Sequence, residues 1–394
     1  MSARGVGDRW ILLALAGVLA ALGFVLARPA RVRLDAWAAA ERAATLSATR
    51  PALAWDGAAW GVAYAESGVE AGGVLFRRLG ADAAPLGPAV TVTPDDTDPP
   101  ALAYDPGTGL WTVAWIGPRG GTPPAVWAAH LDARGAPAGA PLLVKAGDVV
   151  YGCVRVAAGP RGEAGVAWFA TGQERGMRFA RVSRKGARIG GEAQLWSAWE
   201  SPACMTLAWN GTEYGVAYVT RAAGSAADLM LGRVSGLGER LDDPTWIGPA
   251  ADNRASLAWD GEAWAAAWAT WTSVYFARLG PRSAPARPAG DPRAMDPSLA
   301  WIGDGYGVVW TSMDSDSGAR HLVYARLAAD GTPAAPVRLP LDPARDYASP
   351  ALVWNGRELG LAYDRLEDGG RTSVYLARLD RDGNLLAAPA LVAP

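Results

Sequence analysis

The chain has 394 residues, of which 50% are hydrophobic, and its formal net charge is -2. This length allows a large buried core, and near neutrality argues against a nucleic-acid partner, which would require a basic surface stripe. Only two of the 37 basic residues are lysines, Lys145 and Lys185, and alanine, glycine and proline are abundant. We interpret this bias as that of a GC-rich bacterial genome.

The N-terminus forms a separate segment. Residues 11–26 are an uncharged apolar run with arginines on both sides. With its neighbours the run approaches the roughly 18-residue lower limit for a transmembrane helix, and residues 25–27 resemble an imperfect signal-peptidase site. We therefore expect residues 1–27 to be a signal peptide or a transmembrane signal anchor, which would attach the protein to a membrane if uncleaved. Residues 28–48 are then a linker.

A short phrase recurs seven times after this linker. Its first copy, residues 51–64, reads PALAWDGAAWGVAY. The copies follow one another at spacings of 42 to 53 residues, and such a period is typical of repeat architectures. Each copy ends on an aromatic residue: Tyr64, Trp115, Trp168, Tyr218, Trp268, Trp310 and Tyr363.

Each copy of the phrase predicts two strands joined by a turn. In residues 59–64 bulky side chains alternate with glycine or alanine, which is the period of a β-strand. Residues 52–55 form the preceding strand, and Asp56-Gly57 between them is a hairpin turn signal. Both faces of the second strand are uncharged, one bulky and one small. We expect the bulky face of one repeat to pack against the small face of the next.

Two further strands complete each repeat. The third carries a basic residue at an equivalent position. We interpret this residue as a device of the fold that either pairs with turn carboxylates or lies along the blade. The fourth is a short apolar run flanked by proline. In the fifth repeat this region, residues 281–291, is rich in proline, glycine and arginine, so we expect a frayed or missing outer strand. The recurring basic residues are Arg78, His130, Arg181, Arg233, Arg278, Arg326 and Arg378.

Seven repeats of four antiparallel strands resemble an all-β, seven-bladed β-propeller, in which blades stack around a central channel. The motifs do not assign a subfamily. They lack the Gly-His and Trp-Asp pairing of WD40 repeats and the paired glycines of kelch repeats, and Asp316 stands where an Asp-box needs glycine. We expect the propeller to span residues 49–394. Its expected blades are residues 49–97, 98–150, 151–202, 203–251, 252–294, 295–346 and 347–394.

The two cysteines occupy equivalent positions in neighbouring repeats. Cys153 and Cys204 each lie five residues before the same position of the first strand, residues 158 and 209. In a propeller these positions converge near the channel, so we predict a disulfide between them, which would suit an oxidising compartment. The alternative is two buried free thiols.

Propellers usually bind ligands at the mouth of the channel, through loops that lead into the innermost strands. These loops supply a rim of carboxylates, arginines and aromatic residues. Such a rim could hold Ca²⁺, but the arginines would compete for the carboxylates, so we expect no cofactor. Neither of the two histidines, His130 and His321, has an evident catalytic partner. The candidate rim residues are Asp98, Tyr151, Trp199, Glu200, Asp252, Arg254, Asp296, Asp346 and Tyr347.

These observations favour a binding or scaffolding module in the bacterial envelope or secreted from it, which holds a protein or glycan partner outside the cytoplasm. Two alternatives remain. One is a hydrolase or lyase that acts on a sugar or lactone at an acidic channel mouth, which requires polar groups focused on one point with shifted pKa values. The other is a structural subunit of an envelope complex, which requires a large exposed apolar patch. We predict no catalytic residue.

Overall fold

A computed structural model of the protein describes residues 47–67, 72–95, 97–118, 124–147, 154–170, 175–196, 204–221, 227–250, 254–270, 273–279, 286–291 and 293–394. The predicted N-terminal hydrophobic helix, residues 1–27, lies outside these residues, as does nearly all of the linker. Within the described ranges, no helix combines the length and the apolarity needed to cross a membrane.

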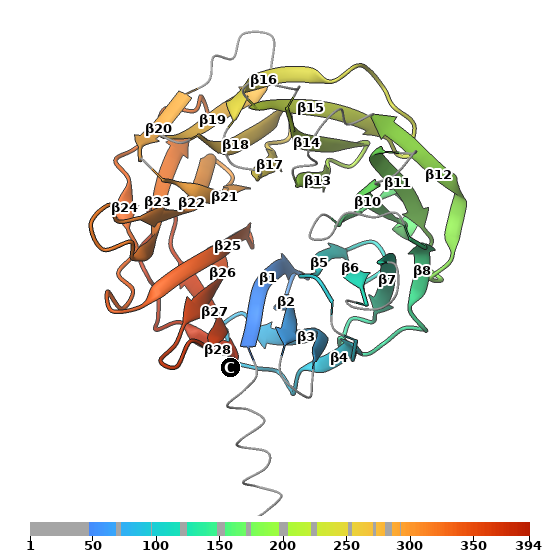
Figure 1. Ribbon diagram of the computed structural model, residues 1–394, viewed down its shortest axis with the longest axis horizontal. Coiled ribbons are helices and arrows are strands. Elements are labelled where there is room, and N and C mark those ends of the chain that lie inside the picture. Colours follow the sequence, from blue (N-terminus) through green and yellow to red (C-terminus); the bar gives the residue numbers. More distant parts are fainter. Residues whose placement is uncertain are drawn as a thin grey trace, which may run out of the picture. The chain divides into compact units, whose positions relative to one another are not determined.

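The described residues form seven four-stranded antiparallel sheets arranged in a ring, which confirms the all-β seven-bladed propeller (Figure 1). Within each sheet the strands follow one another in chain order, and the first strand lies innermost. The innermost strands are β1 (Ser47–Trp55), β5 (Ala101–Asp105), β9 (Arg155–Ala158), β13 (Met205–Trp209), β17 (Ala255–Trp259), β21 (Met295–Trp301) and β25 (Asp346–Trp354).

The remaining strands form three further rings around the channel. The second strands are β2 (Ala59–Ser67), β6 (Leu110–Gly117), β10 (Ala164–Ala170), β14 (Glu213–Arg221), β18 (Trp264–Thr270), β22 (Gly305–Met313) and β26 (Leu359–Leu366). The third strands are β3 (Gly72–Gly80), β7 (Ala125–Leu131), β11 (Gly176–Val182), β15 (Ala227–Ser235), β19 (Ser273–Leu279), β23 (Arg320–Ala328) and β27 (Thr372–Leu379). The outermost strands are β4 (Val90–Thr93), β8 (Leu142–Lys145), β12 (Arg188–Trp196), β16 (Thr245–Ala250), β20 (Ala286–Gly290), β24 (Val337–Arg338) and β28 (Ala390–Ala393).

The two ends of the channel differ in how the chain passes through them. We call the end at which the innermost strands begin the entry end. We call the opposite end, where turns such as Asp56–Ala58 join the first and second strands of each blade, the turn end. Because every innermost strand runs in the same direction through the ring, equivalent positions of the repeats lie at the same end.

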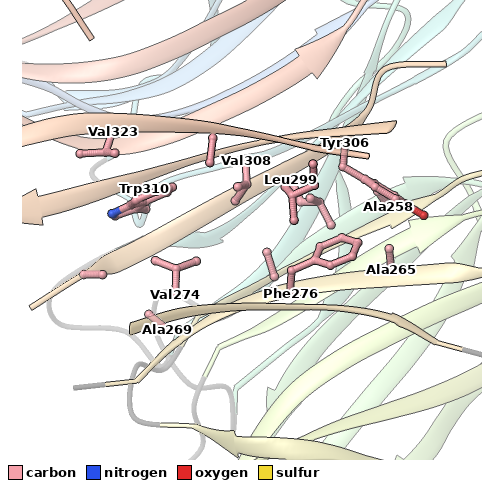
Figure 2. Packing of buried hydrophobic residues seen from close by; sticks show 14 residues of the cluster. Ala258, Ala265, Ala269, Val274, Phe276, Leu299, Tyr306, Val308, Trp310 and Val323 are labelled. Atoms are coloured by element: carbon pink, nitrogen blue, oxygen red, sulfur yellow. The ribbon is translucent and has the colours of Figure 1, made fainter. Parts of the chain in front are cut away.

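The blades pack by inserting an aromatic side chain of one blade against a glycine of the preceding blade. A Cβ atom added to Gly215 would lie 2.8 Å from the ring of Trp264, and one added to Gly165 would lie 2.7 Å from that of Tyr214. These contacts confirm the predicted packing of bulky on small faces. Figure 2 shows a variant of this interface, in which Ala265 takes the glycine position beside Tyr306 of the next blade.

The ring closes by this same packing, without exchange of a strand between the first and last blades. Strands β25 to β28 form a complete sheet from the C-terminal end of the chain, and β1 to β4 form another. Trp60 of the first blade packs against Gly360 of the last, where an added Cβ would lie 2.6 Å from the indole ring. Arg77 also donates a hydrogen bond to the backbone carbonyl of Val392 across this junction.

The recurring basic residue of the third strand pairs with a carboxylate at the turn end in six blades, as the sequence predicts. The pairs are Arg78 with Asp56, Arg181 with Glu163, Arg233 with Glu213, Arg278 with Asp260, Arg326 with Asp304 and Arg378 with Glu358. In the second blade His130 replaces the arginine. Its Nε2 donates to the carbonyl of Ser183 at 2.8 Å, and its Nδ1 accepts from the hydroxyl of Thr112 at 2.9 Å. This histidine is therefore a structural residue.

The expectation of a missing outer strand in the fifth blade is wrong. Strand β20 (Ala286–Gly290) pairs with β19 through Ser273 and Gly290, Val274 and Ala289, and Phe276 and Ala286. The proline within this segment is tolerated because an outermost strand has a free edge, where a missing backbone N–H interrupts no ladder.

Candidate functional site

Two neighbouring cavities with shared lining residues lie at the entry end of the channel. The first has a volume of about 310 Å³ and is lined by residues from all seven innermost strands. The second, of about 420 Å³, lies over the first, second, sixth and seventh blades. They share Arg50, Pro99, Asp296 and Ser349 as walls. We call them the channel cavity and the side cavity.

Three neighbouring blades build this region with the same backbone irregularity. Arg50, Asp296 and Ser349 occupy equivalent positions, each is followed by proline, and their φ angles are 51°, 52° and 53°. At each position a β-bulge shifts the register between the first and second strands of the blade. The left-handed backbone region is uncommon for residues with a side chain and costs on the order of 1–3 kcal/mol. Bulges of this kind occur often beside binding and active sites, where they redirect a side chain.

The charged residues of the channel cavity are mostly arginines. Among its described lining residues, Arg50, Arg155 and Arg254 carry positive charge and Asp296 carries negative charge. Arg254 forms an ion pair with Asp296, with 2.9 Å between Nη1 and Oδ1. The cavity therefore has more positive than negative groups along its described wall.

Arg155 is the most unusual of these groups. It lines the channel cavity, is half-buried there, and its Nη1 donates to the carbonyl of Val154 at 2.7 Å. Burial, together with the nearby charges of Arg254 and Arg50, lowers the pKa of Arg155 to about 10. No carboxylate of the described residues forms an ion pair with it. The equivalent positions of the other blades hold only small residues: Ala52, Ala101, Thr206, Ser256, Ser298 and Ala351.

The side cavity contains a buried carboxyl group. Asp364 on β26 is only 6% exposed, and its Oδ1 accepts a hydrogen bond from the backbone N–H of Arg50 at 2.8 Å. Burial raises the pKa of Asp364 to about 7, although hydrogen bonds from Ser349 and Arg50 oppose this effect. The equivalent positions in the other blades are uncharged: Ala65, Ile116, Phe169, Val219, Ala269 and Thr311.

A buried hydroxyl group also lines the side cavity. Thr97 is 4% exposed, and its Oγ1 has no hydrogen-bond partner in the described part of the chain. Since buried polar groups are almost always hydrogen-bonded, such a group at a cavity wall marks a place where a ligand atom can bind.

The structure brings some of the predicted rim residues to these cavities. Arg254 and Asp296 lie in the channel cavity, and Asp346 lines the side cavity, where it accepts a hydrogen bond from the backbone N–H of Arg320 at 3.0 Å. Asp98 and Tyr347 are each 3% exposed and line neither cavity. Arg254 forms an ion pair with the rim carboxylate Asp296, as expected, and Asp346 pairs with Arg320 of strand β23, which was not among the expected rim residues. The candidates Tyr151, Trp199, Glu200 and Asp252 lie outside the described residues.

Asp98 and Tyr347 instead take part in the packing behind the cavities. The backbone N–H of Asp98 donates to the carbonyl of Ile116 at 2.9 Å. The hydroxyl of Tyr347 donates to the carbonyl of Asp342 at 3.0 Å, and its ring packs edge-on against Tyr363.

Neither a metal cluster nor the predicted disulfide can be placed at this site. Within the described ranges, no group of three or more His, Cys, Asp or Glu side chains is arranged to hold a metal ion. Cys204 lies half-buried before β13 and is not a free thiol. Its predicted partner, Cys153, lies outside the described residues, so the pairing stays a prediction.

Sequence reasoning missed Arg50, Arg155, Thr97 and Asp364. A signal for two of them was present, because Arg155 and Asp364 are the only charged residues at their positions of the repeat. A comparison of equivalent positions across the seven repeats would have singled them out.

Comparison with known proteins supports the fold and assigns no family. No protein-family model and no curated protein matches the chain. An ulvan lyase, a polysaccharide lyase solved bound to -[GlcA(1-4)Rha3S]-, is 10% identical with a TM-score of 0.59, and the match covers 86% of this chain and 95% of the lyase.

Two peptidases match this chain over only part of their own length. A Mycobacterium tuberculosis puromycin-hydrolyzing peptidase is 14% identical with a TM-score of 0.57, and the match covers 89% of this chain and 54% of the peptidase. The Pyrococcus horikoshii acylaminoacyl peptidase is 9% identical with a TM-score of 0.52, and the match covers 85% of this chain and 52% of the peptidase. This chain thus spans about half the length of these peptidases. At such low identity the similarity shows only the shared fold.

Proposed function

We propose that the protein is a binding module that holds a glycan or protein partner at the entry end of its channel. The observation that carries this proposal is the departure from the repeat at that end. Arg155 and Asp364 replace small or uncharged residues beside two neighbouring cavities. Ligand pockets commonly have volumes of about 300–1,000 Å³, so the cavities suit a projecting group such as a sugar unit.

The energetics of the site support the same function. Three left-handed residues, a desolvated arginine and a buried carboxyl each carry a cost in stability, and they lie together at the entry end of the channel. Strain and buried charge of this kind concentrate at functional sites. The apolar N-terminal segment of the sequence supports a place in the bacterial envelope, outside the cytoplasm.

A steric block of the channel tests this function. The full chain is screened by calorimetric titration against neutral oligosaccharides, acidic oligosaccharides and short peptides. Thr206 lines the channel cavity and is partly exposed, so Thr206→Trp would fill space there without changing any charge. We expect it to weaken binding of any ligand by tenfold or more, because the added indole occupies the site.

Thr212→Trp is the matched control, because Thr212 is exposed in a turn at the other end of the channel. Equal binding by both variants, or no binding of any compound by the unaltered protein, would overturn the proposal. Thermal melts of both variants establish that they are folded.

A hydrolase or lyase is the second candidate, and Asp364 is the observation that favours it. A carboxyl with a pKa near 7 can take up and release a proton at neutral pH, as general acid–base catalysis requires. One of the similar structures is a polysaccharide lyase. This candidate requires that acidic oligosaccharides be cleaved by the full chain and that Asp364→Asn abolish cleavage while it preserves binding. Absence of cleavage would exclude it for these substrates.

A further inference from the structure

We propose that the ligand of this site is an acidic sugar, whose anionic group binds Arg50, Arg155 and Arg254 while its hydroxyl groups occupy the side cavity. This inference rests on the proposed function and adds the chemical class of the ligand. A carboxylate or a sulfate on the sugar would supply the same charge.

The distribution of charge in the channel cavity points to an anion. Arg155 interacts electrostatically with both Arg254 and Arg50, and Asp296 forms an ion pair with Arg254. Burial, and then repulsion from the other two guanidinium groups, lowers the pKa of Arg155, and the attraction of Asp296 offsets only part of this effect. An incoming anion would relieve this repulsion. Guanidinium groups bind carboxylate and sulfate oxygens through paired, charge-assisted hydrogen bonds.

The side cavity explains why the ligand should be a sugar and not an acidic peptide. Its charged wall has three carboxyl groups, Asp296, Asp346 and Asp364, against two arginines, Arg50 and Arg320, so a chain of several carboxylates would meet more repulsion here than in the channel cavity. These oxygens can instead accept hydrogen bonds from neutral hydroxyl groups, and Thr97 offers a buried hydroxyl that lacks a partner among the described residues. A sugar presents an anionic group and neutral hydroxyls close together, which matches an excess of arginine in the channel cavity and an excess of aspartate in the side cavity.

Calorimetric titration of the full chain with four probes tests this inference. The probes are trigalacturonate, its uncharged methyl ester, a sulfated trisaccharide and hexaglutamate. We expect trigalacturonate, the sulfated trisaccharide or both to bind at least tenfold more tightly than the methyl ester. The better of the two identifies the anionic group. Affinity should fall as salt concentration rises.

Arginine variants locate the anion. We expect Arg155→Gln to weaken binding of the acidic sugar by on the order of 10- to 100-fold, as the loss of hydrogen bonds to a charged group predicts. Arg155→Lys should recover part of that loss, because it keeps the charge without the paired donors. Arg357→Gln is the control, since Arg357 is exposed at the turn end. Arg254→Gln is a second test should Arg155→Gln fold poorly.

Three outcomes would overturn the inference and leave the proposed function standing, provided that Thr206→Trp still blocks the ligand that binds. These are equal affinity for the acid and its methyl ester, full binding by both arginine variants, and binding of hexaglutamate without binding of either acidic sugar. Failure of the unaltered protein to bind any of these probes, or any compound of the wider screen, would overturn both proposals.

Discussion

At the turn end of the propeller, the recurring arginine of six blades pairs with a carboxylate of its own. At the entry end, three arginines from the first, third and fifth blades share the channel cavity with one aspartate. The first arrangement is repeated around the ring and gives each of these six arginines a carboxylate partner. The second arrangement occurs once. It includes the desolvated guanidinium of Arg155, which has no ion-pair partner among the described residues. The comparison indicates that the repeated ion pairs maintain this fold, whereas the departures from the repeat gather at the proposed binding site.

The first prediction concerns a possible stabilising device at the entry end. Cys153 and Cys204 hold the position that Arg50 holds in the first blade. If they are bonded, Cys204→Ser should lower the free energy of unfolding by about 2–4 kcal/mol, because the link restricts the unfolded chain. Non-reducing peptide mapping and thermal melts with and without reductant measure both the bond and its effect. Two free thiols in the map would contradict the prediction.

The second prediction concerns blade packing near the turn end. Gly360→Ala should destabilise the protein by about 1–3 kcal/mol, because the new methyl group would lie 2.6 Å from the ring of Trp60. Gly191→Ala is the control, since Gly191 has nothing within 4 Å of an added Cβ. Chemical denaturation measures both variants. A neutral effect at Gly360 would show that the first and last blades are not tightly packed there.

The third prediction compares the two ends directly. Arg378→Ala should lower stability by about 1–2 kcal/mol, because it leaves the buried carboxylate of Glu358 without its partner. Arg155→Ala should leave stability unchanged or raise it, because it removes a desolvated charge that its neighbours repel. Thermal melts of both variants provide the comparison. Equal destabilisation would mean that the entry-end arginines also serve the fold.

The fourth prediction concerns pH. Burial raises the pKa of Asp364 to about 7 in the folded state, above the value of 3.8 for an unperturbed group. Between those values the folded state retains a proton that the unfolded state releases, so this residue lowers stability as the pH rises from about 4 to 7. The free energy of unfolding of Asp364→Asn should equal that of the unaltered protein near pH 4 and become the larger of the two as the pH rises to 7 and above.

Unfolding curves at several pH values provide the test, with Asp346→Asn as a control for a carboxylate that is only half-buried. A constant difference between Asp364→Asn and the unaltered protein across this range would contradict the assigned titration.

The architecture could be predicted because its determinants lie close together in sequence and recur. The alternation around Gly61 and the Asp56-Gly57 turn specify a hairpin locally, and seven copies specify a ring. The outer strand of the fifth blade was misjudged because proline and glycine weaken a strand in general. An outermost strand such as β20 tolerates them, since it pairs only with β19 and its other edge is free.

The candidate site could be predicted only in part. Arg254 and Asp296 stand out as polar residues before an innermost strand, but Arg155 and Asp364 lie inside strands whose neighbours are small or apolar. Nothing in their local sequence indicates that they line two neighbouring cavities at the same end of the channel.

The sequence by itself therefore determined the blade, the number of blades and the arginine pairs of the turn end, since these depend on contacts within one repeat or between neighbouring copies. Only the tertiary structure decided the entry end. Closure of the ring brings together Arg50, Arg155, Arg254 and Asp364 from four different blades. Their burial and mutual electrostatic interactions, which give the site its chemistry, exist only after that closure.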